Sequence, residues 1–277
     1  MRVRFGKKII PLTALVLVLC AKTFAQNPDT MDPEQSTGKA KQILKQLIDT
    51  LGGQRYLTIK TSECEGRQAH FGHNGEMSGF TVFKDYWSYP DTRRIDLAKK
   101  GNIIDLFIGN EGWTLDRSGV SEEPATAVTD FQEAVKRDPN NLLRYRLNED
   151  RLLITYGGNA VVDLRPVDWV EIVDSEERTY RLAIDQSTHL LVRSVVYVKD
   201  DVTGERREDV ALYTNYQSKD GVQMPMQISR ERDGRRVSQV FYEACQYNPN
   251  LPADFFTKAA LEKRSSEVGG GKMKLKH

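Results

Sequence analysis

The sequence predicts a mainly β fold with helices, in which a curled antiparallel sheet forms an unclosed barrel beneath a helical lid. Short runs rich in aromatic and β-branched residues follow one another, with turn residues between them. Several runs alternate apolar and polar side chains, so one face of the sheet is apolar and needs a cover. Two other stretches carry apolar residues at helical spacing and can provide that cover.

Strands are expected along most of the chain, because turn residues recur at short intervals. A strand over 57–71 leads through a turn at 73–75 into four short strands between residues 76 and 116. Pro, Gly and Asn separate those four strands at 89–91, 99–102 and 109–112. Further strands are expected at 152–156, 160–173, 179–185, 190–198, 207–216, 222–232 and 237–247. A sheet of about eleven strands must curl to bury one of its faces.

Helices are expected at two places. Apolar residues recur at helical spacing over 39–51, and Gly52 and Gly53 end this helix. Its apolar stripe consists of Ala40, Ile43, Leu44, Leu47, Ile48 and Leu51. A mostly helical pattern also covers 121–148, where Pro139 divides it into two short helices. We expect this second helical layer to lie across the sheet or over one of its mouths.

The chain begins with the features of a secretory signal peptide. Basic residues precede a short apolar core over 9–20, and Thr23, Phe24 and Ala25 form an acceptable cleavage site. No later stretch approaches the roughly 18 apolar residues that a membrane-spanning helix needs. We therefore expect a periplasmic protein. Its expected parts are a signal peptide over 1–25, a flexible N-terminus over 26–38, one folded domain over 39–258 and a disordered tail over 259–277.

The three cysteines bear on export and on covalent cross-linking. Cys20 allows a second interpretation of the leader, in which a lipid anchor is attached to that cysteine, but Leu19 before it is larger than a lipoprotein signal requires. The other two are Cys64 in the first strand and Cys245 in the last. An oxidising compartment allows them to form a disulfide. Two separate thiols are the alternative, because spacing alone does not place cysteines at bonding distance.

Charge and motif content argue against nucleic-acid binding and against catalysis. The chain has 40 Lys and Arg residues and 39 Asp and Glu residues, and the leader holds only basic ones. The mature chain is therefore mildly acidic and lacks the basic surface that nucleic acid requires. CxxC, HExxH, GxSxG and glycine-rich phosphate-binding motifs are missing from the sequence. We expect no enzyme activity, no catalytic residue and no cofactor.

Two groups of polar residues suggest chemistry, but sheet surface explains both better. His70 and His73, with two nearby glutamates, could hold a metal, yet residues three apart along a strand point to opposite faces. We therefore expect no metal site. The carboxylates between Asp163 and Asp174 alternate with apolar residues, as on the wet face of a strand, so acid–base catalysis is not expected there.

The second half of the chain has a layout that resembles a known family. It runs VDLRPVDWVEIVDSEERTYRLAIDQSTHLLVRSVVYV from residue 162, TNYQSKDGVQMPMQIS from residue 214 and NPNLPADFFT from residue 248. This layout resembles the periplasmic outer-membrane lipoprotein carrier superfamily, the LolA/LolB-like proteins, and the resemblance covers 39–256. It implies an unclosed β-barrel whose cavity, under the lid, holds acyl chains. The carriers have a cavity arginine, for which Arg93, Arg94 and Arg144 are the candidates here.

The strand faces supply the candidate ligand site. The residues expected to line the cavity are Phe80, Val82, Ile95, Leu97, Ile104, Leu106, Trp113 and Leu115. The alternative is that these side chains pack against the helices as a dry core, as apolar strand faces usually do. The resemblance implies a carrier that holds a lipid or an acylated lipoprotein without being integral to the membrane. An envelope sensor or protein-interaction module on the same fold, with a protein partner, is the alternative function.

Overall fold

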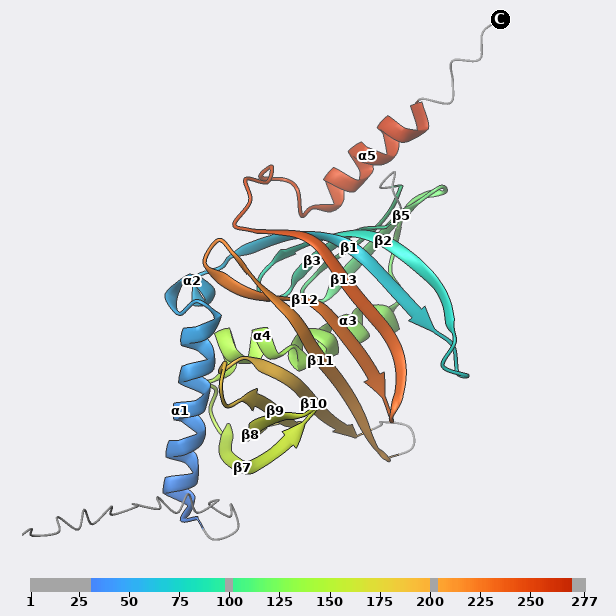
Figure 1. Cartoon of the computed structure of the whole chain (residues 1–277). Helices are drawn as coiled ribbons and strands as arrows, with labels where there is room; N and C mark the ends of the chain where they lie inside the picture. The colour runs from blue at the N-terminus through green and yellow to red at the C-terminus, as the bar shows by residue number, and fades with distance from the viewer. Residues whose placement is uncertain (1–30, 98–101, 200–203, 271–277) are drawn as a thin grey trace, which may run out of the picture.

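The protein is built on one antiparallel sheet that curls into an unclosed barrel (Figure 1). The computed structural model describes residues 31–97, 102–199 and 204–270, so the predicted signal peptide lies outside it. The strands of the described chain follow the order β6-β5-β4-β3-β2-β1-β13-β12-β11-β10-β9-β8-β7. Their bounds are β1 (Thr61–Phe71), β2 (Met77–Ser88), β3 (Thr92–Leu97), β4 (Ile103–Ile108), β5 (Glu111–Asp116), β6 (Gly119–Glu122), β7 (Leu153–Val162), β8 (Arg165–Val173), β9 (Thr179–Asp185), β10 (Leu191–Lys199), β11 (Arg206–Lys219), β12 (Val222–Arg232) and β13 (Arg235–Tyr247).

Two consecutive meanders make up this sheet. Strands β1 to β6 form the first and β7 to β13 the second, and each strand pairs with its neighbour in sequence. The meanders meet where β1 pairs with β13. Cys64 and Cys245 lie directly opposite each other in that ladder, with their Cα atoms 4.1 Å apart, and they form a disulfide. The bridge fastens the first strand to the last.

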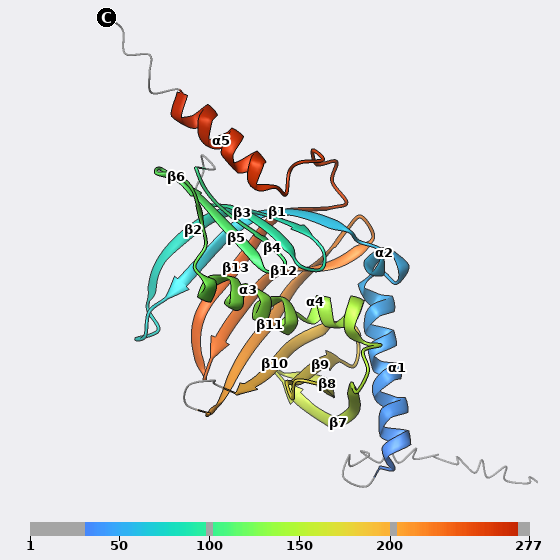
Figure 2. The same ribbon diagram turned by 180° about the vertical axis from the view of Figure 1, so that it is seen from behind.

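A helical segment joins the two open edges of the sheet. Strands β6 and β7 are the edges, and between them the chain forms α3 (Ala125–Arg137), α4 (Pro139–Asn141) and the π-helical turn η2 (Leu142–Arg146). Figure 2 shows α3 and α4 lying across the concave side of the sheet. The helical segment breaks just before Pro139, as predicted, because proline lacks the backbone N–H that a helix interior needs. We call the segment from α3 to η2 the lid.

The helix α1 (Pro33–Leu51) packs mainly against β7, β8 and β12. It begins at Pro33 rather than at the predicted residue 39, so the predicted flexible N-terminus is helical from that proline onward. The Asp32 side chain caps the helix by accepting from the Glu34 N–H, and proline suits the first helical position. Full burial of a leucine such as Leu47 stabilises the fold by about 1.5–3 kcal/mol. After α1, the short helix α2 (Gln54–Leu57) leads into β1.

The hairpin between β7 and β8 differs from the prediction. The sequence suggested a turn at 157–159, but β7 continues through these residues with a shift of register between Tyr156 and Asn159. The turn falls instead at Asp163 and Leu164, which have φ angles of 48° and 64°. Gly157 and Gly158 therefore allow a β-bulge rather than a turn. A turn and a bulge both need the backbone freedom that glycine provides.

The C-terminal segment corrects a second prediction. A disordered tail was expected from residue 259, whereas α5 (Lys258–Gly270) is helical; residues 271–277 lie outside the described ranges. Leu261 on α5 is fully buried and belongs to a cluster with Ile104, Leu106 and Leu115 of the sheet. A polar, lysine-rich composition concealed this anchor, because one buried leucine is enough to dock the start of a short helix. Figure 1 shows α5 on the outer side of the sheet, away from the lid.

The disulfide yields a prediction about stability. Replacing both cysteines, Cys64→Ala with Cys245→Ala, should lower the free energy of unfolding by about 2–5 kcal/mol, because the unfolded chain regains the freedom of a long closed loop. The two residues are 181 positions apart. Denaturant unfolding under non-reducing conditions measures the change, and the wild-type protein with reductant should match the double variant. Equal stability in all three samples would contradict the prediction.

Candidate functional site

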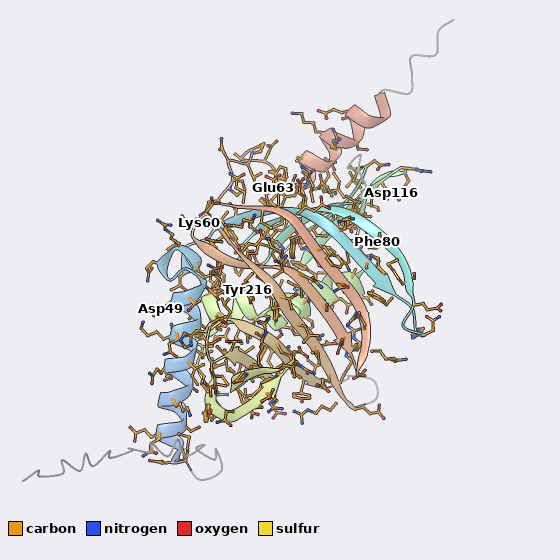
Figure 3. The ribbon with its side chains drawn as sticks, viewed as in Figure 1. Asp49, Lys60, Glu63, Phe80, Asp116 and Tyr216 are labelled. Carbon is orange, nitrogen blue, oxygen red and sulfur yellow. A yellow bond between two sulfur atoms is a disulfide. The ribbon has the colours of Figure 1, made fainter. Side chains whose placement is uncertain are left out.

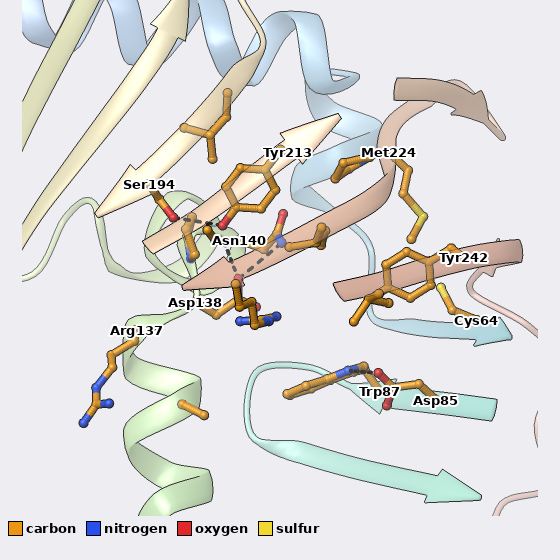
Figure 4. Close-up of a pocket in the computed structure, with 18 of the residues that line it drawn as sticks. Cys64, Asp85, Trp87, Arg137, Asp138, Asn140, Ser194, Tyr213, Met224 and Tyr242 are labelled. Carbon is orange, nitrogen blue, oxygen red and sulfur yellow. Dashed lines mark hydrogen bonds between the residues drawn. The ribbon is translucent and has the colours of Figure 1, made fainter. Parts of the chain in front are cut away.

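A cavity lies between the lid and the concave face of the sheet. Its volume is about 470 Å³, within the range of sites that hold small molecules. The lid contributes residues between Phe131 and Arg144, and the sheet contributes residues of β1 to β3 and of β10 to β13. Figure 4 looks into this cavity, where Asp138 lies between Tyr213 on one side and Trp87 on the other.

Much of the cavity wall is aromatic. The aromatic residues that line it are Tyr56, Phe83, Trp87, Tyr89, Phe131, Tyr213, Tyr216, Tyr242 and Tyr247. Burial raises the pKa of Tyr213, Tyr242 and Tyr247 to about 12, so these hydroxyls stay neutral. The Tyr213 hydroxyl lies 3.0 Å from Ser194 Oγ, a contact drawn in Figure 4. The aromatic part of the wall is thus uncharged and suited to apolar ligand surface.

One ion pair in the cavity wall, between Arg93 and Asp85, satisfies its own charges. Arg93 donates from Nε to Asp85 Oδ1 at 2.8 Å and from a terminal nitrogen to Oδ2 at 3.1 Å. Trp87 Nε1 donates to the same carboxylate at 3.3 Å. The Asp85 side chain is only 8% exposed. A bidentate pair of this kind satisfies both charges, so this part of the wall offers little charge to a ligand.

Besides Arg137, the lid places two charged side chains in the cavity, Asp138 and Arg144. Asp138 caps α4, where its Oδ1 accepts from the Asn140 N–H at 2.9 Å. Burial raises the pKa of Asp138 above its ordinary value, although that hydrogen bond and the nearby Arg230 and Arg144 oppose the shift. The Arg144 guanidinium lies over the ring of Tyr89, 4.2 Å from its centroid. The lid therefore brings both signs of charge into a space that is partly lined by aromatic rings.

Ion pairs fasten the C-terminal half of α3 to the sheet. Glu133 of α3 accepts from Arg178, between β8 and β9, at 2.8 Å. Arg137 at the end of α3 donates to Asp209 of β11 at 3.2 Å. Because these contacts are made by side chains, the lid is held down without strand pairing to the sheet.

A buried carboxylate organises the sheet side of these contacts. The Asp174 side chain is fully buried and accepts from Arg146 at 3.0 Å, from the Tyr180 hydroxyl at 3.1 Å and from Arg178 at 3.3 Å. Burial by itself would raise the pKa of Asp174, but hydrogen bonds from Arg178 and Arg146 hold it below the ordinary value. The network therefore depends on an ionised carboxylate beneath the lid.

One of the eight predicted lining residues, Ile95, lines the cavity. Leu97 shares the face of Ile95 on β3 but lies beyond the lining. Phe80 and Val82 lie on the opposite face of β2 from Phe83, which lines the cavity, and they are 58% and 37% exposed. The prediction that Leu97, Phe80 and Val82 face the ligand is therefore corrected.

The other four predicted lining residues lie on the outer face of the sheet. They are Ile104, Leu106, Trp113 and Leu115, which pack around Leu261 of α5. Leu106 pairs with Arg94 on β3, and directly paired residues share a face, so Leu106 is on the face opposite Ile95. The apolar side of the meander thus changes from the inner to the outer face between β3 and β4. Alternation within a strand does not show how neighbouring strands align.

Most of the lining comes from strands that the sequence analysis did not consider for the site. These are mainly β11 to β13, with Tyr213, Ile228, Val240 and Tyr242. Their alternating pattern was visible in the sequence, but their role depends on the pairing of β13 with β1. Of the candidate cavity arginines, Arg93 and Arg144 line the cavity, whereas Arg94 is buried on the outer face and pairs with Asp96.

The polar groups set aside in the sequence analysis remain separate in the structure. Within the described residues no group of three or more His, Cys, Asp and Glu side chains could hold a metal ion. His70 Nε2 lies 2.9 Å from Thr81 Oγ1. Asp168 accepts from the Tyr156 hydroxyl, and Asp174 belongs to the network under the lid. Asp168 and Asp174 thus have structural partners.

No family model and no curated protein matches the sequence. Solved structures do match. A DUF1329 family protein from Desulfovibrio piger has a TM-score of 0.56 at 14% identity, covering 83% of this chain and 100% of that one. A LolA superfamily protein from Nitrosomonas europaea has a TM-score of 0.51 at 16% identity, covering 80% and 99%. The fold is LolA-like.

A third structure extends this LolA-like similarity. It is a domain assigned to outer-membrane lipoprotein sorting from Vibrio parahaemolyticus, with a TM-score of 0.52 at 10% identity, covering 83% of this chain and 100% of that one. At these identities the similarity establishes the fold alone. Among the described residues, no helix has the length and apolar character needed to cross a membrane.

The network under the lid predicts acid sensitivity. Hydrogen bonds from Arg178 and Lys136 lower the pKa of Glu176 to about 2, and the pKa of Asp174 is also lowered. A carboxylate with a lowered folded-state pKa stabilises the fold above its unfolded-state pKa and loses that contribution as pH falls. The free energy of unfolding should therefore decrease as pH is lowered from 6 towards 3.

A variant of Glu133 on α3 tests whether the network causes this decrease in the free energy of unfolding. Burial opposes ionisation of Glu133, but Arg178 and its neighbours lower the pKa of this carboxyl. Glu133→Gln should therefore make the protein less stable at pH 6. It should also make the free energy of unfolding depend less on pH. Glu111→Gln, at an exposed turn, is the matched control and should behave like wild type. Denaturant unfolding across the pH range measures both. A wild-type slope in the Glu133 variant would show that the network does not carry the effect.

Proposed function

We propose that the protein binds a lipid, or the acyl chains of a lipoprotein, in the cavity between the lid and the sheet. The observation that carries this proposal is a cavity of about 470 Å³ inside a LolA-like fold, whose wall combines nine aromatic residues with aliphatic side chains and with charges that are largely paired. The aromatic and aliphatic parts of this wall make few hydrogen-bond demands on a ligand. It suits non-covalent binding rather than catalysis.

Acyl-chain burial alone can supply useful affinity. Each methylene removed from water contributes about 0.8 kcal/mol, so a chain that buries several methylenes gains enough free energy to offset the cost of immobilising it. The aliphatic side chains of Ile95, Ile228 and Val240 complete the wall between the aromatic rings. The cavity therefore needs no sequence motif to bind such a ligand.

The position of the lid favours a ligand that enters and leaves. The lid lies across the sheet and its described ion pairs to the sheet are made by side chains, such as Glu133 with Arg178 and Arg137 with Asp209. It can move away without breaking a β-ladder. This property suits a carrier, which must release what it binds.

We place the protein in the periplasm. The basic and apolar leader of the sequence supports export, and the Cys64–Cys245 disulfide is typical of an oxidising compartment. The structure from Vibrio parahaemolyticus is assigned to lipoprotein sorting, which supports an acylated lipoprotein as one class of cargo here.

Native mass spectrometry of the protein purified from a bacterial periplasm, followed by lipid extraction, tests the proposal. We expect stoichiometric acyl lipid to co-purify. The variant Ile228→Asp should lose it, because Ile228 lies between Tyr213 and Val240, and an unpaired carboxylate in this apolar part of the wall would have to be desolvated against the acyl chain. The matched control is Phe80→Asp, on the outer face, which should retain lipid.

Two further measurements keep the test decisive. Ile228→Trp fills the cavity without adding a charge and should also lose lipid, and near-ultraviolet circular dichroism checks that each variant is folded. A clean apo mass for wild type, with no uptake of added fatty acid or lipopeptide, would overturn the proposal. That result would support a protein-interaction module on the same fold.

A further inference from the structure

Charges in the cavity are numerous but mostly satisfied. Five arginines and four carboxylates belong to the lining, namely Arg93, Arg137, Arg144, Arg230, Arg232, Asp85, Asp138, Asp209 and Glu231. Asp85 is paired with Arg93, and Asp209 with both Arg137 and Arg232. Glu231 makes no ion pair with a described residue. Because it pairs with Val210 while Arg230 pairs with Ala211, its side chain lies on the face of the sheet opposite that of Arg230. The charges that remain are Arg144, Arg230 and Asp138.

These three leave one guanidinium in excess. Arg144, Arg230 and Asp138 line the same cavity. The Arg144 guanidinium lies over the ring of Tyr56, whose hydroxyl donates to Asn140, two residues from Asp138. A single carboxylate therefore shares this space with two cations. One oxygen of the Asp138 carboxylate already accepts a hydrogen bond from the Asn140 N–H. Within the part of the chain that the structure describes, neither arginine has an ion-pair partner closer than 4.0 Å.

Hydrogen-bond donors without a described partner lie in the same part of the cavity. Arg144 Nε is buried and has no hydrogen-bond partner among the described residues. Arg230 lines the cavity with an exposed side chain, and no described residue accepts a hydrogen bond from it. The hydroxyl of Tyr242 lies in the same electrostatic neighbourhood and is likewise without a described partner. The buried Nε of Arg144 is costly to leave unpaired. Arg230 and the Tyr242 hydroxyl are further donors, and an acceptor on a ligand would pair with such groups.

We infer that the cavity selects amphiphiles with an anionic headgroup, a carboxylate or a phosphate, which binds at Arg230 and Arg144 while the acyl chain lies along the aromatic wall. This inference rests on the proposed function and names the class of ligand. Guanidinium groups form charge-assisted, often bidentate, hydrogen bonds with both anions. The excess cation and the free donors of the cavity are met by one such group.

A cationic headgroup fits the same place poorly. It would have to approach Asp138, which is flanked by Arg144 and Arg230 and already accepts from Asn140. The guanidinium groups of Arg144 and Arg230 would repel a cationic headgroup in this partly desolvated cavity. A neutral headgroup would leave the donors unpaired. The predicted order of affinity is therefore anionic, then neutral, then cationic.

Titration calorimetry with ligands that share one chain tests this order. The probes are dodecanoate, dodecyl phosphate, dodecanol and dodecylamine, each below its micelle concentration, with inorganic phosphate as a chain-free probe. The two anionic amphiphiles should bind the wild-type protein about ten-fold more tightly than dodecanol, since a charged hydrogen bond contributes about that much. Inorganic phosphate should bind far more weakly than dodecyl phosphate.

Three variants locate the effect. Arg230→Met should reduce the affinity for dodecanoate to that for dodecanol and leave dodecanol binding unchanged. Asp138→Asn should tighten dodecanoate binding, because asparagine keeps the helix cap but removes the opposing charge. Arg235→Met, at the exposed turn between β12 and β13, is the matched control and should behave like wild type.

The outcomes separate this inference from the proposed function. Equal affinity for all four amphiphiles would overturn headgroup selection and leave lipid binding standing. Binding of none of them would overturn the proposed function itself. Inorganic phosphate binding as tightly as dodecyl phosphate would identify a site for free phosphate and contradict an amphiphile site. An Arg230→Met protein that is folded and still prefers dodecanoate would contradict the assignment to this arginine.

Discussion

The ladder between β1 and β13 is the interaction on which the rest of the structure depends. It joins two meanders that each pair only with themselves elsewhere, and the cavity wall is drawn from both sides of the join. Without this ladder, β2 and β3 would not face the same space as β10 to β12. The Cys64–Cys245 bridge lies within the ladder and makes the join covalent. The first and last strands of the described sheet are therefore neighbours at the centre of the fold, not at its edges.

The sheet separates two kinds of apolar surface. Its concave face carries the cavity and the packing of α1, whereas the outer face of β4 and β5 carries a dry cluster closed by Leu261 of α5. Figure 3 shows the side chains spread over both faces of the sheet. Phe80 of β2 is exposed, and Tyr216 of β11 packs against the cluster that contains the buried residues of α1. A chain with two apolar faces needs two covers. The lid supplies the inner one with space beneath it, and α5 supplies the outer one without space.

Local patterns predicted the elements well and the site poorly. Helical spacing and Pro139 located α1 and the lid, and alternation located most strands. Ile95 and Leu106 both alternate correctly, yet they lie on opposite faces, because the face of a strand follows from its register with its neighbours. The bulge at Gly157 and Gly158 and the helix α5 were missed because a glycine pair serves turns and bulges alike, and because one leucine can anchor a polar segment. Long-range pairing was the information that the sequence withheld.

The join between first and last strands also sets an order of assembly. Each meander is made of hairpins between consecutive strands, which close short loops and form quickly, whereas β1 must wait for β13, whose cysteine lies 181 positions away. A chain that is made available N-terminus first can form strands β1 to β6 long before β13, the pairing partner of β1, is present. During that interval the edge of β1 is an open template for pairing with another chain. The ladder between β1 and β13 is therefore expected to close late in folding, because its contact order is high.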